Sequence, residues 1–133
     1  MKIFEDPTTR AIIQCICRVH RILGPGFLEC IYRRALLKEL RTAGLRSETE
    51  KEIDVVDEGE VVGQHRLDIL VEGTVVIELK TVEVLGKAHY AQIRSYLKAT
   101  RLKVGILVNF ATALADFRRV ENTDFVSISP PIS

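Results

Sequence analysis

Three charged side chains interrupt the two apolar runs of residues 68–83, which read DILVEGTVVIELKTVE. They are Asp68, Glu78 and Lys80, and the Glu-Gly turn between the runs predicts a β-hairpin. A charge on the inner face of a sheet is costly to bury unless it is paired or binds a metal. Two carboxylates followed by a lysine suit metal-assisted cleavage of a phosphodiester. The acids would hold a hard divalent cation, and the lysine would steady the attacking water.

The loop of this hairpin decides whether the two carboxylates share a face, because strand side chains alternate. A two-residue loop would point Asp68 away from Glu78. A three-residue loop at residues 71–73, with its glycine left-handed in a bulge, pairs Asp68 with Val76 and lays it diagonal to Glu78. The sequence favours this second register, because glycine in third place is what the bulge requires. Arg66 and the lysine then lie on the same surface.

The alternative to a site is a surface hairpin whose polar face meets water, which alternating strands form routinely. Two features count against it. Leu70 and Val76 lie on the same side as the charges, so that side is not uniformly polar. The charges also cluster at one end of the hairpin.

A third carboxylate lies on the helix predicted over residues 27–42. Placed at ~100° per residue, Glu29 falls inside the apolar arc of this helix, between Leu36 and Leu40. A buried glutamate without a partner is rare, so Glu29 requires either a metal or an ordinary ion pair. The helix predicted over residues 87–100 adds a polar trio beside its apolar face. This trio, which either lines a site or forms a boundary stripe, is His89, Gln92 and Tyr96.

The elements that must position these groups follow from apolar periodicity. The pattern predicts helices at residues 7–23, 27–42 and 87–100, the first capped by Asp6 and Pro7. Three strands lie between residues 48 and 83, and a buried strand covers residues 103–110. ALADFRRV, residues 113–120, predicts a short helix, and DFVSIS, residues 124–129, an edge strand. The order predicts an α/β (α+β) fold, with a central mixed β-sheet flanked by helices.

Composition indicates one globular domain over residues 1–133, with 47% hydrophobic and 28% charged residues. No segment reaches the ~18 consecutive apolar residues of a membrane span, and no apolar signal core precedes the first charges. Three cysteines at irregular spacing fit reduced thiols in a cytoplasm. The formal net charge of +1 neither predicts nor excludes a nucleic-acid partner.

Four motifs in order resemble those of one protein family. GQHRLDILVEGTVVIELK, residues 63–80, resembles the active-site hairpin of the PD-(D/E)XK nuclease superfamily, with Asp68 at its aspartate and residues 78–80 as its (D/E)-X-K. GFLECIY, residues 26–32, fits the signature of the prokaryotic GxxExxY family within that superfamily. The spacing H-x-x-Q-x-x-x-Y from His89 and the segment NFATALADFRRV resemble its later motifs. Two departures are Leu67 in place of a proline and His65 in place of a tyrosine.

The resemblance implies a restriction-endonuclease-like αβββαβ core and a metal-dependent nuclease. Glu29, Asp68 and Glu78 would converge on Mg²⁺ (or Mn²⁺), with the backbone carbonyl of Leu79 as an extra ligand. Lys80 would contact the water or the scissile phosphate, with Gln92 nearby. The residues implied as supporting or phosphate contacts are Arg66, His89, Tyr96 and Tyr32.

The expected function is therefore hydrolysis of DNA or RNA in the cytoplasm, without a membrane partner. A domain this small is also a candidate for a homodimer that holds a duplex. A second hypothesis is a weakly active or inactive nuclease-fold module that binds nucleic acid or a protein, because little chain is left for a DNA-reading element. A third is catalysis on a nucleotide or other small phosphorylated substrate. The basic residues of the second helix are either a solvated face or a phosphate track: Arg33, Arg34, Lys38 and Arg41.

Overall fold

The computed structural model describes residues 6–122, which form three helices and five strands. The elements are α1 (Pro7–Leu23), α2 (Glu29–Thr42), β1 (Ser47–Asp57), β2 (Glu60–Val71), β3 (Val75–Lys80), α3 (Lys87–Thr100), β4 (Val104–Asn109) and β5 (Asp116–Glu121). The strands form one sheet in the order β1-β2-β3-β4-β5. Only β3 and β4 pair in parallel, so the sheet is mixed. This confirms the predicted α+β fold and its αβββαβ core.

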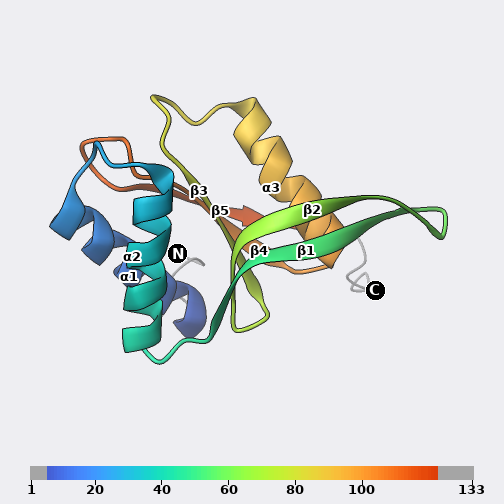
Figure 1. Ribbon diagram of the computed structural model, residues 1–133, viewed down its shortest axis with the longest axis horizontal. Coiled ribbons are helices and arrows are strands. Elements are labelled where there is room, and N and C mark those ends of the chain that lie inside the picture. The colour runs from blue at the N-terminus through green and yellow to red at the C-terminus, as the bar shows by residue number, and fades with distance from the viewer. Residues whose placement is uncertain (1–5, 123–133) are drawn as a thin grey trace, which may run out of the picture.

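Helices cover both faces of the sheet, α1 and α2 on one side and α3 on the other (Figure 1). The two strands β1 and β2 continue past the rest of the sheet as a long hairpin (Figure 1). In β3, Val75, Ile77 and Leu79 pack against α1 and α2, while Val76 packs towards α3. Burial on both faces explains why β3 reads as an almost unbroken apolar run. A charged residue in this strand is therefore forced into the interior.

Residues 116–120 belong to a strand, so the short helix predicted over residues 113–120 is wrong. β5 pairs antiparallel with β4, from Val104↔Glu121 to Asn109↔Asp116. Phe117 packs in the cluster beneath α1 and α2, whereas Val120 packs in the cluster beneath α3. Residues three apart lie on one side of a helix but on opposite sides of a strand, so only the strand buries both side chains in these two clusters. The strand predicted at residues 124–129 lies outside the described residues.

Among residues 6–122, no helix combines the length and the apolar character needed to cross a membrane.

Gly105 in β4 makes room for Ile93 of α3 against the sheet. A Cβ at this position would lie 2.8 Å from Cδ1 of Ile93, which is fully buried on α3. We expect Gly105→Ala to lower the free energy of unfolding by about 1–3 kcal/mol, because overpacking forces α3 or Ile93 to move. Thermal and urea unfolding measure this loss. Gly63→Ala is the matched control, since its Cβ would meet nothing within 4 Å. Equal stability of the two variants would contradict this packing.

Candidate functional site

The candidate site lies where the pairing of β2 and β3 ends. Three pairs join these strands: Ile69↔Ile77, Leu70↔Val76 and Val71↔Val75. One position further along, the same register sets Asp68 opposite Glu78. There the backbone N–H of Leu79 donates to Oδ2 of Asp68 at 2.9 Å. The Asp68 carboxylate thus takes the place of the backbone carbonyl that would normally accept this N–H in the sheet. It lies in the opening between β2 and β3.

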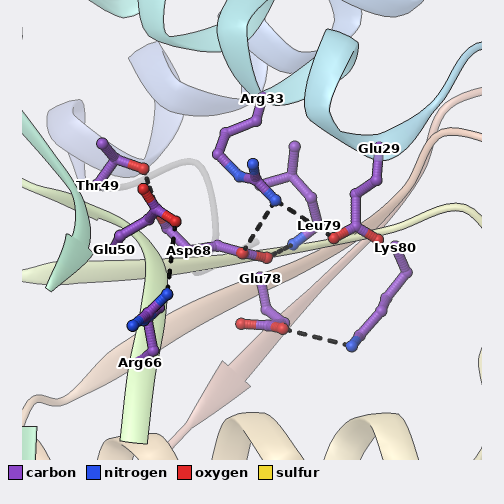
Figure 2. Close-up of polar contacts among 9 residues, drawn as sticks. All are labelled: Glu29, Arg33, Thr49, Glu50, Arg66, Asp68, Glu78, Leu79 and Lys80. Atoms are coloured by element: carbon purple, nitrogen blue, oxygen red, sulfur yellow. Dashed lines mark hydrogen bonds and ion pairs between the residues drawn. The ribbon is translucent and has the colours of Figure 1, made fainter. Parts of the chain in front are cut away.

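The loop that sets this register differs from the predicted one. The pairing of Asp68 with Val76 is wrong, because Val71 pairs with Val75 and the loop consists of residues 72–74. Glu72 and Gly73 both have left-handed backbones, with φ of 54° and 64°. The shift is two positions, and an even shift would leave both side chains on the same face if the strands alternated regularly. Asp68 and Glu78 are neighbours across the strands, and the charge of Asp68 adds to burial in raising the pKa of Glu78 (Figure 2).

Strict alternation fails in β2 at this point. Leu67 and Leu70 both pack beneath α3, although they are three residues apart. Glu50, on the neighbouring strand β1, has a left-handed φ of 56° beside this irregularity. The backbone therefore twists at Asp68, and this turns its carboxylate towards α2, where Arg33 meets it.

Glu78 is the most deeply buried carboxylate of the site, with 5% of its surface exposed. Its Oε2 lies 3.4 Å from Nζ of Lys80, whose side chain is 19% exposed. Its Oε1 is buried and has no hydrogen-bond partner. Burial, with a further contribution from the charge of Asp68, raises the pKa of Glu78 to about 8, although Lys80 opposes the shift. This side chain is short of positive charge, and a cation at Oε1 would supply it.

Glu29 is the first residue of α2 and reaches the same opening from above the sheet (Figure 2). Burial raises the pKa of Glu29, as does the charge of Asp68, while Lys80 and Arg33 oppose the shift. Oε2 of Glu29 lies 3.5 Å from NH2 of Arg33, which in turn lies 3.6 Å from Oδ1 of Asp68. Helix α2 therefore brings both an acid and a base to the carboxylates of the hairpin.

Arg33 is the site residue that sequence reasoning missed, because it was grouped with the basic face of its helix. The signal available was its spacing from Glu29. Residues four apart on a helix face one another, so an arginine one turn after a partly buried glutamate is its natural partner.

Tyr32 holds the start of α2, whose N-cap residue Leu28 offers no side-chain hydrogen bond. The Tyr32 hydroxyl donates to the carbonyl of Gly24 at 2.5 Å and accepts from the N–H of Phe27 at 3.2 Å. Its ring is fully buried and stacks on Phe110 with centroids 4.6 Å apart. The hydroxyl is thus engaged within the fold, where it fixes the turn that places Glu29.

The trio on α3 divides between the site and the helix end. Tyr96 is buried, and burial together with the charges of Glu78 and Asp68 raises the pKa of Tyr96 to about 12. Tyr96 therefore borders the carboxylates, and Gln92, one turn earlier on α3, hydrogen-bonds with it through its side chain. His89 instead caps the helix, where its Nδ1 accepts from the N–H of Gly86 at 2.9 Å.

Arg66 is not brought to the carboxylates. Its guanidinium lies 3.7 Å from Glu50 (Figure 2) and 3.5 Å from Glu52, both on β1, and its side chain is 63% exposed. The predicted common surface of Arg66 and Asp68 is therefore absent, because the twist at Asp68 separates the two side chains.

The carboxylates have the chemistry that a hard divalent cation requires, although they do not form a preformed coordination site. Within residues 6–122, no three His, Cys, Asp or Glu side chains gather closely enough to hold an ion as they stand. Arg33, Lys80 and the N–H of Leu79 occupy their oxygens instead. The unpartnered Oε1 of Glu78 is the open position. Oxygen donors of this kind are what Mg²⁺ and Mn²⁺ take.

Comparison with known proteins adds a family and a fold. A family model described as the PD-(D/E)XK nuclease superfamily matches residues 6–120. The alkaline exonuclease LHK-Exo from Laribacter hongkongensis is similar in structure, with a TM-score of 0.54 and 15% identity over 92% of this chain and 74% of that chain. The protein SSO0001 is similar with a TM-score of 0.56 and 22% identity, over 71% of this chain but only 50% of that one. No curated protein matches the chain.

The buried carboxyl group of Glu78 makes the stability of the metal-free protein depend on pH. The pKa of Glu78 is about 8 in the folded chain, against an ordinary value of 4.5. In the pH window between these two values, the folded chain keeps a proton that the unfolded chain has released. The free energy of unfolding therefore falls as pH rises through the window. We expect the melting temperature in chelator to fall more between about pH 6 and about pH 9 for the wild type than for Glu78→Gln. Identical pH profiles would contradict the raised pKa.

Proposed function

The chain belongs to the PD-(D/E)XK nuclease superfamily, and from this premise we propose that it is a metal-dependent nuclease that hydrolyses phosphodiester bonds of DNA or RNA. The observation that carries the proposal is the meeting of Glu29, Asp68 and Glu78 beside Lys80, with one carboxylate oxygen buried and unpartnered. Membership of the GxxExxY family, a single domain over residues 1–133 and a cytoplasmic location form part of the same proposal.

The three carboxylates would hold the ion, Mg²⁺ or Mn²⁺, with the backbone carbonyl of Leu79 as a further ligand. When bound, a divalent cation supplies a Lewis acid that neutralises charge on the phosphate and lowers the pKa of water. A bound divalent cation would keep its carboxylate ligands ionised, including Glu78, whose pKa is raised to about 8 without it. Burial of Glu78 excludes water from one side of the site and strengthens its electrostatics.

Lys80 is the residue placed to act on the nucleophile or the phosphate. Its Nζ is held 3.4 Å from Oε2 of Glu78, with most of the side chain buried. An ammonium fixed beside a carboxylate can donate to a phosphate oxygen and orient a water at the same time. Gln92 and Tyr96 border the same region from α3 and offer further donors.

The substrate is expected to approach the site away from strand β1, whose acids are only partly compensated by Lys51 and Arg66. Strand β1 carries exposed acidic residues, which repel a phosphate backbone. They are Glu48, Glu50, Glu52 and Asp54. A homodimer that holds a duplex stays part of the proposal.

One observation favours a second candidate, a nuclease-fold module with weak turnover or none. Arg33 and Lys80 already pair with the carboxylates of the site without any metal. A site neutralised in this way could bind nucleic acid and fail to cleave it. Binding that weakens with salt, without turnover in any divalent metal, would distinguish this module from the nuclease.

Removal of Asp68 tests the proposal. We expect the wild type to cleave at least one of single- or double-stranded DNA or RNA with Mg²⁺ or Mn²⁺, and to stop in chelator. Asp68→Ala and Lys80→Ala should each lower the rate by about 100-fold or more, because each removes a group that stabilises the transition state. Initial cleavage rates on labelled oligonucleotides give the result.

Asp54→Ala is the matched control, an acidic residue on β1 that hydrogen-bonds only Gln64 among the described side-chain contacts. It should cleave like the wild type. Circular dichroism checks that each variant is folded. Cleavage by Asp68→Ala at the wild-type rate would contradict the proposed site, and absence of cleavage by the wild type on every substrate would favour the binding module.

A further inference from the structure

The Arg33 guanidinium joins two carboxylates that come from different elements. Its NH2 lies 3.5 Å from Oε2 of Glu29 on α2 and 3.6 Å from Oδ1 of Asp68 on β2 (Figure 2). The side chain is 24% exposed, so its charge is only partly screened by water. One nitrogen therefore links α2 to the hairpin at the position where the two acids of the site approach each other.

The contacts of Arg33 with Glu29 and Asp68 have the geometry of weak ion pairs that a cation could replace. Strong arginine–carboxylate pairs are bidentate, with N–O distances of about 2.7–2.9 Å. Here a single nitrogen serves both acids at longer distances, and Nε of Arg33 is buried without a hydrogen-bond partner. Electrostatic attraction therefore holds the guanidinium in place, and its Nε–H donor is not used in a hydrogen bond.

The charges at the site show what Arg33 does there. With all three carboxylates ionised, as a metal site requires, Glu29, Asp68 and Glu78 face two cations, Lys80 and Arg33, and three negative charges against two positive ones leave −1. Without Arg33 the same groups carry −2. A divalent cation between Glu29 and Asp68 would lie within a few ångströms of the guanidinium, where like charges repel strongly in a partly buried site.

We infer that Arg33 is an internal counter-ion that occupies the metal position between Glu29 and Asp68 and competes with the divalent cation for their oxygens. The inference rests on the proposed function and adds its regulation: the site loads metal only when the guanidinium leaves. Arg33 thereby sets the metal concentration at which the site fills. In the metal-free protein it stabilises the folded state by compensating the charges of Glu29 and Asp68.

Titration with Mn²⁺ alone tests this competition, without any nucleic acid. In isothermal calorimetry, Arg33→Gln should bind Mn²⁺ about 3- to 30-fold more tightly than the wild type, because a competing charge has gone. Arg34→Gln is the matched control: it removes the same charge from the exposed neighbouring position and should change the affinity less than about twofold. Asp68→Ala should abolish the binding in both backgrounds, which assigns it to this site.

The variant Arg33→Lys tests whether the charge of Arg33 or the shape of its guanidinium lowers the affinity for Mn²⁺. It keeps the positive charge on α2 and should bind Mn²⁺ with an affinity close to that of the wild type. Tight binding by both the lysine and the glutamine variants would overturn the inference, since charge would then not be the cause.

Stability gives a second readout that a merely structural role would not reproduce. In chelator, Arg33→Gln should melt at a lower temperature than the wild type, because Glu29 and Asp68 have lost their partner. With saturating Mn²⁺ it should gain more than the wild type, since tighter binding to the folded state stabilises it further. A structural role alone predicts a loss under both conditions.

The outcomes separate this inference from the proposed function. Equal or weaker Mn²⁺ binding by Arg33→Gln, while the wild type binds at a site that Asp68→Ala removes, would overturn the counter-ion and leave the metal site standing. No Mn²⁺ binding by either protein would overturn the inference and count against the metal site as well. Cleavage by the wild type decides separately whether the chain is a nuclease.

Discussion

Negative charge gathered at the end of the β2–β3 ladder is the constraint on which the rest of the site depends. Asp68 and Glu78 lie opposite each other there, and Glu29 faces them from α2. Such charges need compensation, because the interior offers little water to solvate them. The chain supplies part of it through Arg33, Lys80 and the N–H of Leu79, and it leaves one oxygen of Glu78 without a partner. That deficit is what points to a cation.

The surrounding fold is arranged to keep these charges in place. β3 is buried on both faces, so Glu78 cannot turn out to solvent without unpacking its neighbours. The stack of Tyr32 on Phe110 fixes the turn before α2, and so the position of Glu29. On the other face, Gly105 lets α3 approach β4 closely, and α3 brings Tyr96 and Gln92 to the site. The superfamily match covers residues 6–120, which include all of these elements.

Much of the fold follows from local sequence signals, whereas the details of the site depend on tertiary contacts. The cap at Asp6 and the apolar periods predict the helices, and the helix at residues 87–100 agrees with α3. The loop register was mispredicted because Glu72, a non-glycine residue, adopts a left-handed backbone that local propensity disfavours. The sequence predicts a helix at residues 113–120, where β5 forms instead, since the pairing of this strand with β4 is not visible locally. The spacing of Arg33 from Glu29 indicates an ion pair within α2, whereas the contact of Arg33 with Asp68 forms only on folding.

The central claim is that Glu29, Asp68 and Glu78 share one divalent cation, and the most direct measurement is a crystal structure with Mn²⁺ recorded at the manganese absorption edge. The account predicts one anomalous peak in the opening between β2 and β3, about 2.0–2.6 Å from oxygens of Asp68 and Glu78, with the Arg33 guanidinium displaced from its present place. A peak elsewhere, or an opening that holds no ion at a saturating Mn²⁺ concentration while Arg33 still bridges Glu29 and Asp68, would contradict it.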